Sequence, residues 1–203
     1  MKKAILTLLL VSILPGIAAA QDSKPFRLGL KLAPHIAWAS PVDKGVKSDG
    51  SVMGFNFGLM GDFRLGNDNY ALSTGLFYTV KTGAKFTSTI DSTTVKTSAK
   101  LQYVQLPLAV KLKTNEIGYI TYFGLIGAGL GLNVGAKGDV TTVTNGRTVK
   151  LEDEDISDNI AFFRAGLLVG AGMEYNFSGN TSAVVGLNYS NGFTNMLDKD
   201  MGK

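Results

Sequence analysis

The 203-residue chain contains no cysteine and a single histidine, His35. Without cysteine there is no disulfide framework, no thiolate metal site and no cysteine nucleophile, and a lipoprotein anchor is excluded. A Ser-His-Asp arrangement would have to use His35, which we interpret instead as a polar residue near the outer end of a strand. The sequence therefore predicts a non-enzymatic protein without a cofactor or a metal.

Proline is also scarce, with five in the chain, and no Pro-rich or Ser-rich linker divides it. The length suits one domain. The formal net charge is +4, and removing Lys2 and Lys3 with the leader described below leaves a balance of +2. No basic stripe interleaved with aromatic residues is present, so no nucleic-acid partner is expected.

Long apolar runs are missing except at the N-terminus. A basic start is followed by an apolar run over residues 4–14, and small residues stand at Ala18 and Ala20. This order is typical of a secretory signal peptide. A retained anchor is the alternative, but the run falls short of the about 20 residues that span a bilayer. We predict a signal peptide over residues 1–20 and an exported body over 21–203.

Residues 117–135 carry no charge and are the one segment of the body that resembles a transmembrane helix. Six glycines stand in it, among them Gly124, Gly127, Gly129, Gly131 and Gly135, and glycine is the residue least suited to helix interiors after proline. A strand is therefore the better interpretation.

What the chain does contain is alternation of apolar and polar residues, which is typical of strands. Seven stretches show it: 26–38, 53–64, 70–82, 100–112, 118–134, 160–176 and 181–191. The connections between them are long and short in turn: 39–52, 65–69, 83–99, 113–117, 135–159 and 177–180. This order predicts an all-β, antiparallel up-and-down transmembrane β-barrel with short periplasmic turns and long outer loops.

One face of each stretch is apolar and the other is rich in glycine and polar residues. Glycine would be unusual on a solvated surface but suits the interior of a narrow barrel. Aromatic residues near the strand ends suit the two membrane interfaces: Trp38, Tyr70, Tyr119 and Tyr175. A lipid-facing wall is favoured, and a soluble lipocalin-like barrel is the alternative.

Seven strands do not close a bacterial single-chain barrel, which has an even number. We therefore expect a barrel of the eight-stranded type whose last strand is missing from this chain, so that the domain over 21–203 is incomplete at its C-terminal end. An unpaired edge in lipid would leave backbone groups unsatisfied.

Charged residues on the polar faces form the candidate site. They carry both signs: Lys31, Asp62, Arg64, Lys81, Lys111, Arg164 and Glu174. An eight-stranded barrel is only wide enough for its own side chains. We expect a packed polar network with pairing across the lumen near the periplasmic end by Arg64, Lys111 and Glu174, and no diffusion pore.

The densest acidic cluster lies in the connection 135–159. Its members are Glu152, Asp153, Glu154, Asp155 and Asp158. Carboxylates suit a hard divalent cation, but the spacing is not that of a calcium loop. We interpret the cluster as part of a solvated loop.

Five segments resemble the PorT-like small outer-membrane β-barrel family: Leu28–Leu32, Tyr103–Lys111, Gly127–Gly131, Gly166–Tyr175 and Tyr189–Asn195. The resemblance covers nearly all of the mature chain, although its motifs are strand patterns and not a catalytic signature. It implies an eight-stranded outer-membrane barrel ending in one more strand, and it does not carry over the secretion role of any one member.

The expected location is the outer membrane of a Gram-negative cell. Outer-membrane lipid and, during biogenesis, the barrel-assembly machinery are the expected partners. We predict a structural or surface-binding role through the outer loops 39–52, 83–99 and 135–159, because loops on a rigid scaffold carry binding. Accessory service to an outer-membrane secretion or transport machine is the alternative.

Overall fold

The computed structural model describes residues 25–38, 46–90, 93–144, 147–157, 160–178 and 181–194. The strands in this part of the chain are β1 (Phe26–Ala37), β2 (Val46–Ser48), β3 (Val52–Arg64), β4 (Tyr70–Ile90), β5 (Thr93–Lys113), β6 (Ile120–Thr144), β7 (Arg147–Asp155), β8 (Phe163–Ser178) and β9 (Thr181–Gly192). Within it, no helix is long and apolar enough to cross a bilayer. The predicted signal peptide lies outside the described residues.

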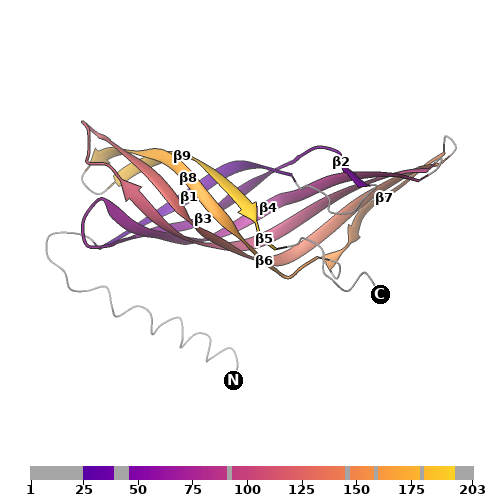
Figure 1. Cartoon of the computed structure of the whole chain (residues 1–203), viewed down its shortest axis with the longest axis horizontal. Helices are drawn as coiled ribbons and strands as arrows, with labels where there is room; N and C mark the ends of the chain where they lie inside the picture. Colours follow the sequence, from indigo (N-terminus) through magenta and orange to yellow (C-terminus); the bar gives the residue numbers. More distant parts are fainter. Residues whose placement is uncertain are drawn as a thin grey trace, which may run out of the picture.

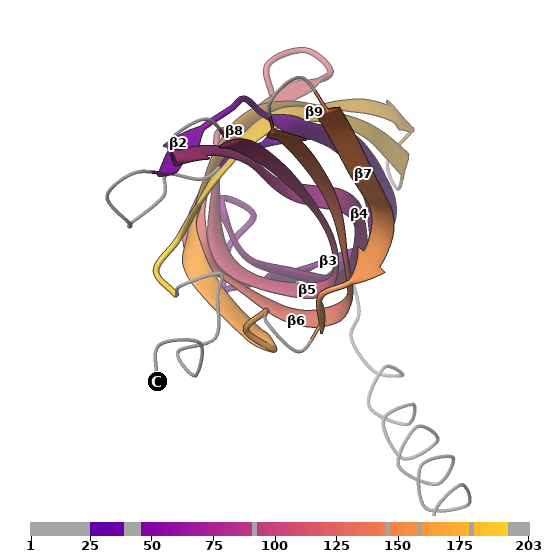
Figure 2. The same cartoon turned by 90° about the vertical axis from the view of Figure 1, so that its right-hand side faces the viewer.

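The strands form one curled antiparallel sheet. Its main path follows the order β1-β3-β4-β5-β6-β8-β9, while β2 adds to β4 and β7 adds to β6. Each strand of the path pairs with the next long strand along the chain, as in an up-and-down meander. Viewed along the long axis, the sheet curves around a lumen (Figure 2). The predicted all-β barrel class is confirmed.

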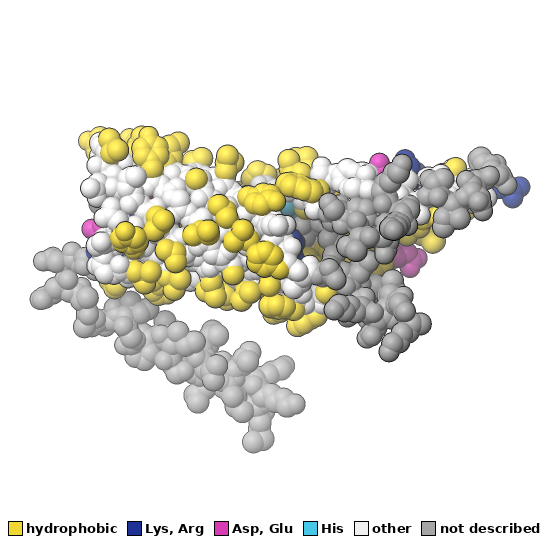
Figure 3. All heavy atoms as spheres, in the orientation of Figure 1, with side chains coloured by type: hydrophobic (Ala, Val, Ile, Leu, Met, Phe, Trp, Pro, Cys, Tyr) yellow, Lys and Arg dark blue, Asp and Glu magenta, His cyan; other side chains and the backbone are white. Residues whose placement is uncertain are grey.

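Alternate residues of each strand face the outside and the lumen. In β1, Leu30 is 85% and Leu32 is 75% exposed, whereas Lys31 between them is partly buried. On the face seen in Figure 3, apolar side chains are spread along the length of the barrel. Buried charged side chains, in contrast, stand on inward-facing positions of the strands. A wall that is apolar outside and polar inside is that of a membrane barrel, and the soluble alternative is wrong.

Three strands are much longer than the alternation predicts. β4 and β5 have 21 residues each and β6 has 25, about twice the 9–11 residues with which a strand crosses a bilayer. Their excess projects beyond the barrel, on the right of Figure 1. We call the projecting sheet the outer extension; it comprises β2, β7 and residues 82–90, 93–102 and 135–144. The predicted loops 83–99 and 135–159 are corrected accordingly, since most of their described residues are paired strand.

Two β-bulges explain why the alternation stops early. The β4 register shifts between Thr79 and Thr82, where Lys81 has a φ of 57°. The β6 register shifts at Val134, opposite Gln102 and Tyr103 of β5. Each bulge inserts one residue and moves the inward face to the other parity. A pattern of period two is broken there although the strand continues.

The short connections lie at the end of the barrel opposite the outer extension. Leu65–Asn69 joins β3 to β4 and contains Gly66 with a φ of 78°, and residues 114–119 join β5 to β6 with Gly118 at 68°. These left-handed conformations favour glycine. In membrane barrels the short turns are periplasmic, so the outer extension faces the cell exterior.

The main path of the sheet is open at both ends among the described residues, at β1 and at β9. Both strands run from the periplasmic end toward the outer end, so they cannot pair with each other in an antiparallel manner. The rings of Trp38 and Tyr189 lie 6.5 Å apart at the outer end of this opening. One descending strand between β9 and β1 would close the sheet, as the predicted eighth strand would.

Candidate functional site

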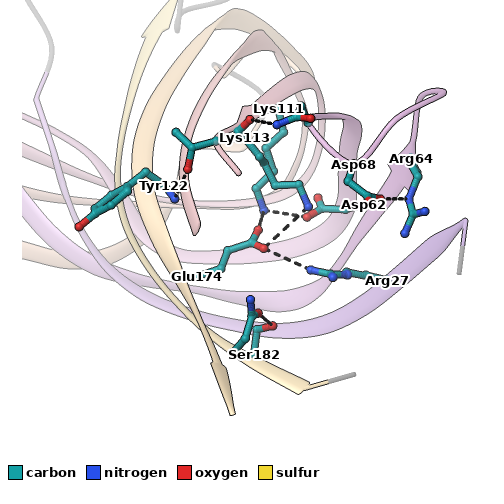
Figure 4. Close-up of polar contacts among 12 residues, drawn as sticks. Arg27, Asp62, Arg64, Asp68, Lys111, Lys113, Tyr122, Glu174 and Ser182 are labelled. Carbon is teal, nitrogen blue, oxygen red and sulfur yellow. Dashed lines mark hydrogen bonds and ion pairs between the residues drawn. The ribbon is translucent and has the colours of Figure 1, made fainter. Parts of the chain in front are cut away.

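Three buried charges from different strands meet at the periplasmic end of the lumen. Lys111 on β5 places its Nζ 2.7 Å from Asp62 Oδ2 on β3 and 2.5 Å from Glu174 Oε1 on β8. Their side chains are only 2% to 7% exposed. Figure 4 shows them converging from opposite walls. Each stands on the inward-facing parity of its strand, which is why the fold brings them together. We call these residues the lumenal triad.

Two further cations extend the triad. Arg27 on β1 places Nη1 3.3 Å from Glu174 Oε2, and Lys113 Nζ lies 3.9 Å from the same oxygen. Sequence analysis did not single out either residue, although each shares inward parity with a residue that it did identify. The Arg27–Glu174 pair links β1 to β8 across the open side of the sheet. A cavity of about 250 Å³ opens at this end, and its lining includes Arg27, Asp62 and Lys113.

The ammonium of Lys111 is fully engaged by the triad, although Asp62 Oδ1 has no hydrogen-bond partner among the described residues. Burying a charge is costly unless it is paired and hydrogen-bonded, and Lys111 is paired with two carboxylates and also lies 4.3 Å from the centroid of the Phe123 ring. These side chains cross the lower lumen beside the cavity and leave no free charge on Lys111 for a ligand. We therefore interpret the lumenal triad as a plug of the barrel and not as a binding site for an ion in transit.

Arg64 does not take part in this pairing. Its Nε lies 2.8 Å from Asp68 Oδ1 in the short turn, and the Asp68 side chain is 78% exposed. Figure 4 shows this pair beside the lumenal triad. The expected pairing of Arg64 across the lumen is thus corrected, because the last residue of β3 is closer to the turn than to the opposite wall.

Two other predicted cations contact aromatic rings higher in the lumen. Lys31 Nζ lies 4.9 Å from the Phe77 ring centroid, and Arg164 Cζ lies 6.0 Å from that of Tyr103. A cation over a ring face is attracted by the ring quadrupole. Lys81, in contrast, is an exposed residue of the β4 bulge. The seven predicted charges therefore do not form one network.

His35 lies on the lumenal side of β1. Both of its ring nitrogens are buried and lack hydrogen-bond partners among the described residues. Its ring lies against the backbone of β3, since a Cβ at Gly54 would come within 2.8 Å of Cε1. In this part of the chain His35 is thus not linked to a serine or a carboxylate.

A small apolar cluster lies at the outer end of the barrel, on the wall formed by β5 and β6. Buried Ala99, Leu101 and Tyr103 of β5 pack with Ala136 of β6 and with Ile160, and Ile156 covers the cluster. The segment after β7 is fixed there by backbone hydrogen bonds, since Ile156 N donates to Ala136 O and Ile160 N to Ser157 O. Ile156 and Ile160, which follow the acidic run, were the sequence signal for this cluster.

The described members of the acidic cluster, Glu152–Asp155, lie on β7. Asp153 has a φ of 57° at a bulge, and its backbone N–H donates to Asp139 Oδ1. Lys100 Nζ lies 2.6 Å from Asp139 and 3.9 Å from Asp153. Its hydrogen bond to Asp139 lowers the pKa of that carboxyl and raises the pKa of the lysine. Among the described residues, which leave out Asp158, no group of three side chains is placed to hold a metal ion.

The family comparison covers almost all of the chain. The model of the outer membrane protein beta-barrel domain matches residues 19–198. No curated protein and no solved structure shows significant similarity to the chain.

Proposed function

Because the chain belongs to the outer membrane protein beta-barrel domain family, we propose that it is a surface-binding protein whose ligand docks on the outer extension. The barrel itself is an integral outer-membrane anchor. In this proposal the protein is non-enzymatic and its partners, besides lipid, are reached from outside the cell.

The observation that carries the proposal is the outer extension. Strands β4, β5 and β6 continue without a break from the membrane wall into a five-stranded sheet. Flexible loops sample many conformations and lose entropy when a ligand binds. A hydrogen-bonded sheet is already ordered, so it loses less entropy on binding. The long strands thus build a rigid platform outside the membrane.

The side chains inside the lumen support the same proposal, because they argue against transport through the centre of the barrel. The lumenal triad occupies the periplasmic end, and the apolar cluster lies on the wall of the outer end. An eight-stranded barrel has room only for its own side chains. Transport through the centre of the barrel is therefore disfavoured, and the outer extension is left as the functional surface.

The PorT-like resemblance and the accessory role remain the finer alternative. A component of a secretion or transport machine would be expected to contact partners from its periplasmic turns as well. Exposed Ile117 and Tyr119 in the turn between β5 and β6 offer such a contact.

Site-specific photo-crosslinking in intact cells tests these alternatives. A photoreactive residue at Lys96 or Lys150 on the outer extension should form adducts with a binding partner, while the same residue at Asn115 in a periplasmic turn serves as the control. Adducts from Lys96 or Lys150 alone support surface binding. Adducts from Asn115 alone would favour the accessory role, and no adduct at any position would contradict both.

A further inference from the structure

β7 is an edge strand of the outer extension. It pairs with β6 on one side, and no described strand lies on its other side. All nine of its residues are exposed. In the view along the barrel axis, β7 lies at the near end of the molecule (Figure 2). Such an edge presents unpaired N–H and C=O groups to a further strand.

The side chains of β7 are divided by charge. Arg147 and Lys150 stand in its first half, and the acidic run Glu152–Asp155 fills its second half. Between them lie Val149 and Leu151, which are 59% and 51% exposed. Apolar side chains at the centre of a surface with a charged surround are typical of a protein interface.

This strand is complementary to itself in one orientation. When two copies of β7 lie antiparallel with Leu151 near the centre, the basic half of each strand faces the acidic half of the other. Opposite charges across neighbouring strands stabilise pairing and like charges oppose it. A parallel arrangement would instead place Arg147 beside Arg147 and the two acidic runs side by side.

We propose that β7 pairs antiparallel with β7 of a second copy of this chain, joining the two outer extensions into one sheet. The pairing is isologous, since the same surface serves both subunits. This inference rests on the proposed function, because it takes the outer extension as the binding surface and names its partner.

The fold determines where the second copy must lie. The outer extension continues the barrel wall (Figure 1), so the normal of its sheet is radial and lies in the membrane plane. The twofold axis that relates two antiparallel strands of one sheet is parallel to that normal. The second copy is therefore inverted and belongs to a facing membrane. Two copies in one membrane could present their β7 strands only in the same direction.

The bulge at Asp153 leaves enough exposed charge on β7 for this contact. Lys100 lies between Asp139 and Asp153 and offsets one of their two negative charges. Glu152, Glu154 and Asp155 remain exposed for the basic half of a partner. A charged edge resists indiscriminate strand pairing, which makes the oppositely charged half of a second copy the preferred occupant.

Tethering of vesicles that carry the full chain tests the proposal. Two vesicle populations with different fluorophores are mixed, and energy transfer between the populations is measured at low and high salt. Wild-type vesicles should cluster with each other but not with protein-free vesicles, and high salt should weaken the clustering because it screens the ion pairs.

Charge-swap variants make the test specific. Arg147→Glu with Lys150→Glu, and Glu152→Lys with Glu154→Lys and Asp155→Lys, should each lose clustering with themselves, and mixing the two variants should restore it. Lys81→Glu with Lys85→Glu makes a matched change at exposed positions of β4, away from β7, and should cluster as the wild type does.

Each other outcome overturns the proposal. Failure of the wild type to cluster, clustering with protein-free vesicles, or no restoration on mixing would each contradict β7 pairing. Adducts of Lys150 with another protein in cells, without vesicle clustering, would leave surface binding intact and remove only the self-pairing. Absence of both adducts and clustering would remove the proposed function as well.

Discussion

At the periplasmic end of the lumen, the ammonium of Lys111 is shared by two carboxylates from opposite walls of the barrel. Removing one member of a buried ion pair leaves an uncompensated charge and costs more than the pair contributes. An exposed pair is screened by water and is worth little. The same chain contains both kinds, since Arg64 pairs with exposed Asp68 in a turn.

Replacing Lys111 is therefore expected to be far more harmful than replacing Arg64. Lys111→Met leaves Asp62 and Glu174 buried without their shared cation and should lower the free energy of unfolding by about 3–5 kcal/mol. Arg64→Met should lower it by less than about 1 kcal/mol. Urea unfolding of the protein in lipid vesicles measures both. Equal effects of the two variants would contradict the assignment of Lys111 to a buried triad.

The pair of Lys100 and Asp139 predicts how the outer extension responds to pH. The pKa of Asp139 is held below its ordinary value of 3.8, so its stabilising contribution is complete above that value and is lost as the pH falls through the lowered pKa. The pKa of Lys100 is raised above 10.5, so its contribution is lost only as the pH rises through the raised value.

Carbon-13 NMR titration of the Asp139 carboxyl should give a midpoint below 3.8, because the hydrogen bond from Lys100 favours the ionised form. In the Lys100→Met variant the midpoint should move back toward the ordinary value. A midpoint at or above 3.8 in the wild type would show that this ion pair is not formed.

At the scale of elements, the alternation of apolar and polar residues predicts the membrane-crossing strands well. The predicted 26–38 and 53–64 correspond to β1 (Phe26–Ala37) and β3 (Val52–Arg64). The alternation fails where a bulge changes the inward parity, as at Lys81 in β4 and Val134 in β6. Beyond these bulges Thr, Ser, Lys and Gly predominate, and the buried Ala99, Leu101 and Ala136 are too few to continue the apolar alternation.

The same reasoning applies to the candidate site. Inward parity is visible in the sequence, and it identified Asp62, Lys111 and Glu174 as lumenal residues. Which charges meet depends on strand tilt and on the height of each residue along the axis, and neither can be derived from parity. Arg64 is the example, since its neighbour in space is a turn residue.

Glycine on the inward face of β6 gives a prediction for this element. A Cβ at Gly127 would lie 2.1 Å from Leu108 O and 2.4 Å from Ala109 Cα of β5, whereas a Cβ at Gly129 would meet nothing within 4 Å. Gly127→Ala should destabilise the barrel because the β5 backbone must move, and Gly129→Ala on the same face should not. Thermal melting in detergent compares them, and equal melting temperatures would contradict the close approach of β5 and β6.

At the scale of the whole molecule, two regions have different solvents. The barrel wall exposes apolar side chains to lipid, and the outer extension exposes charged and polar side chains to water (Figure 3). The periplasmic turns and the outer extension lie at opposite ends of the barrel. This polarity is the premise of both the surface-binding proposal and the pairing of β7 across facing membranes.

Cysteine accessibility in intact cells tests this arrangement most directly, because the chain has no cysteine of its own. Lys96→Cys and Lys150→Cys on the outer extension should react with a membrane-impermeant maleimide in intact cells. Asn115→Cys in the periplasmic turn should react only after the outer membrane is permeabilised. Labelling of Asn115→Cys in intact cells, with Lys96→Cys and Lys150→Cys protected, would contradict an outward-facing extension and with it the proposed binding surface.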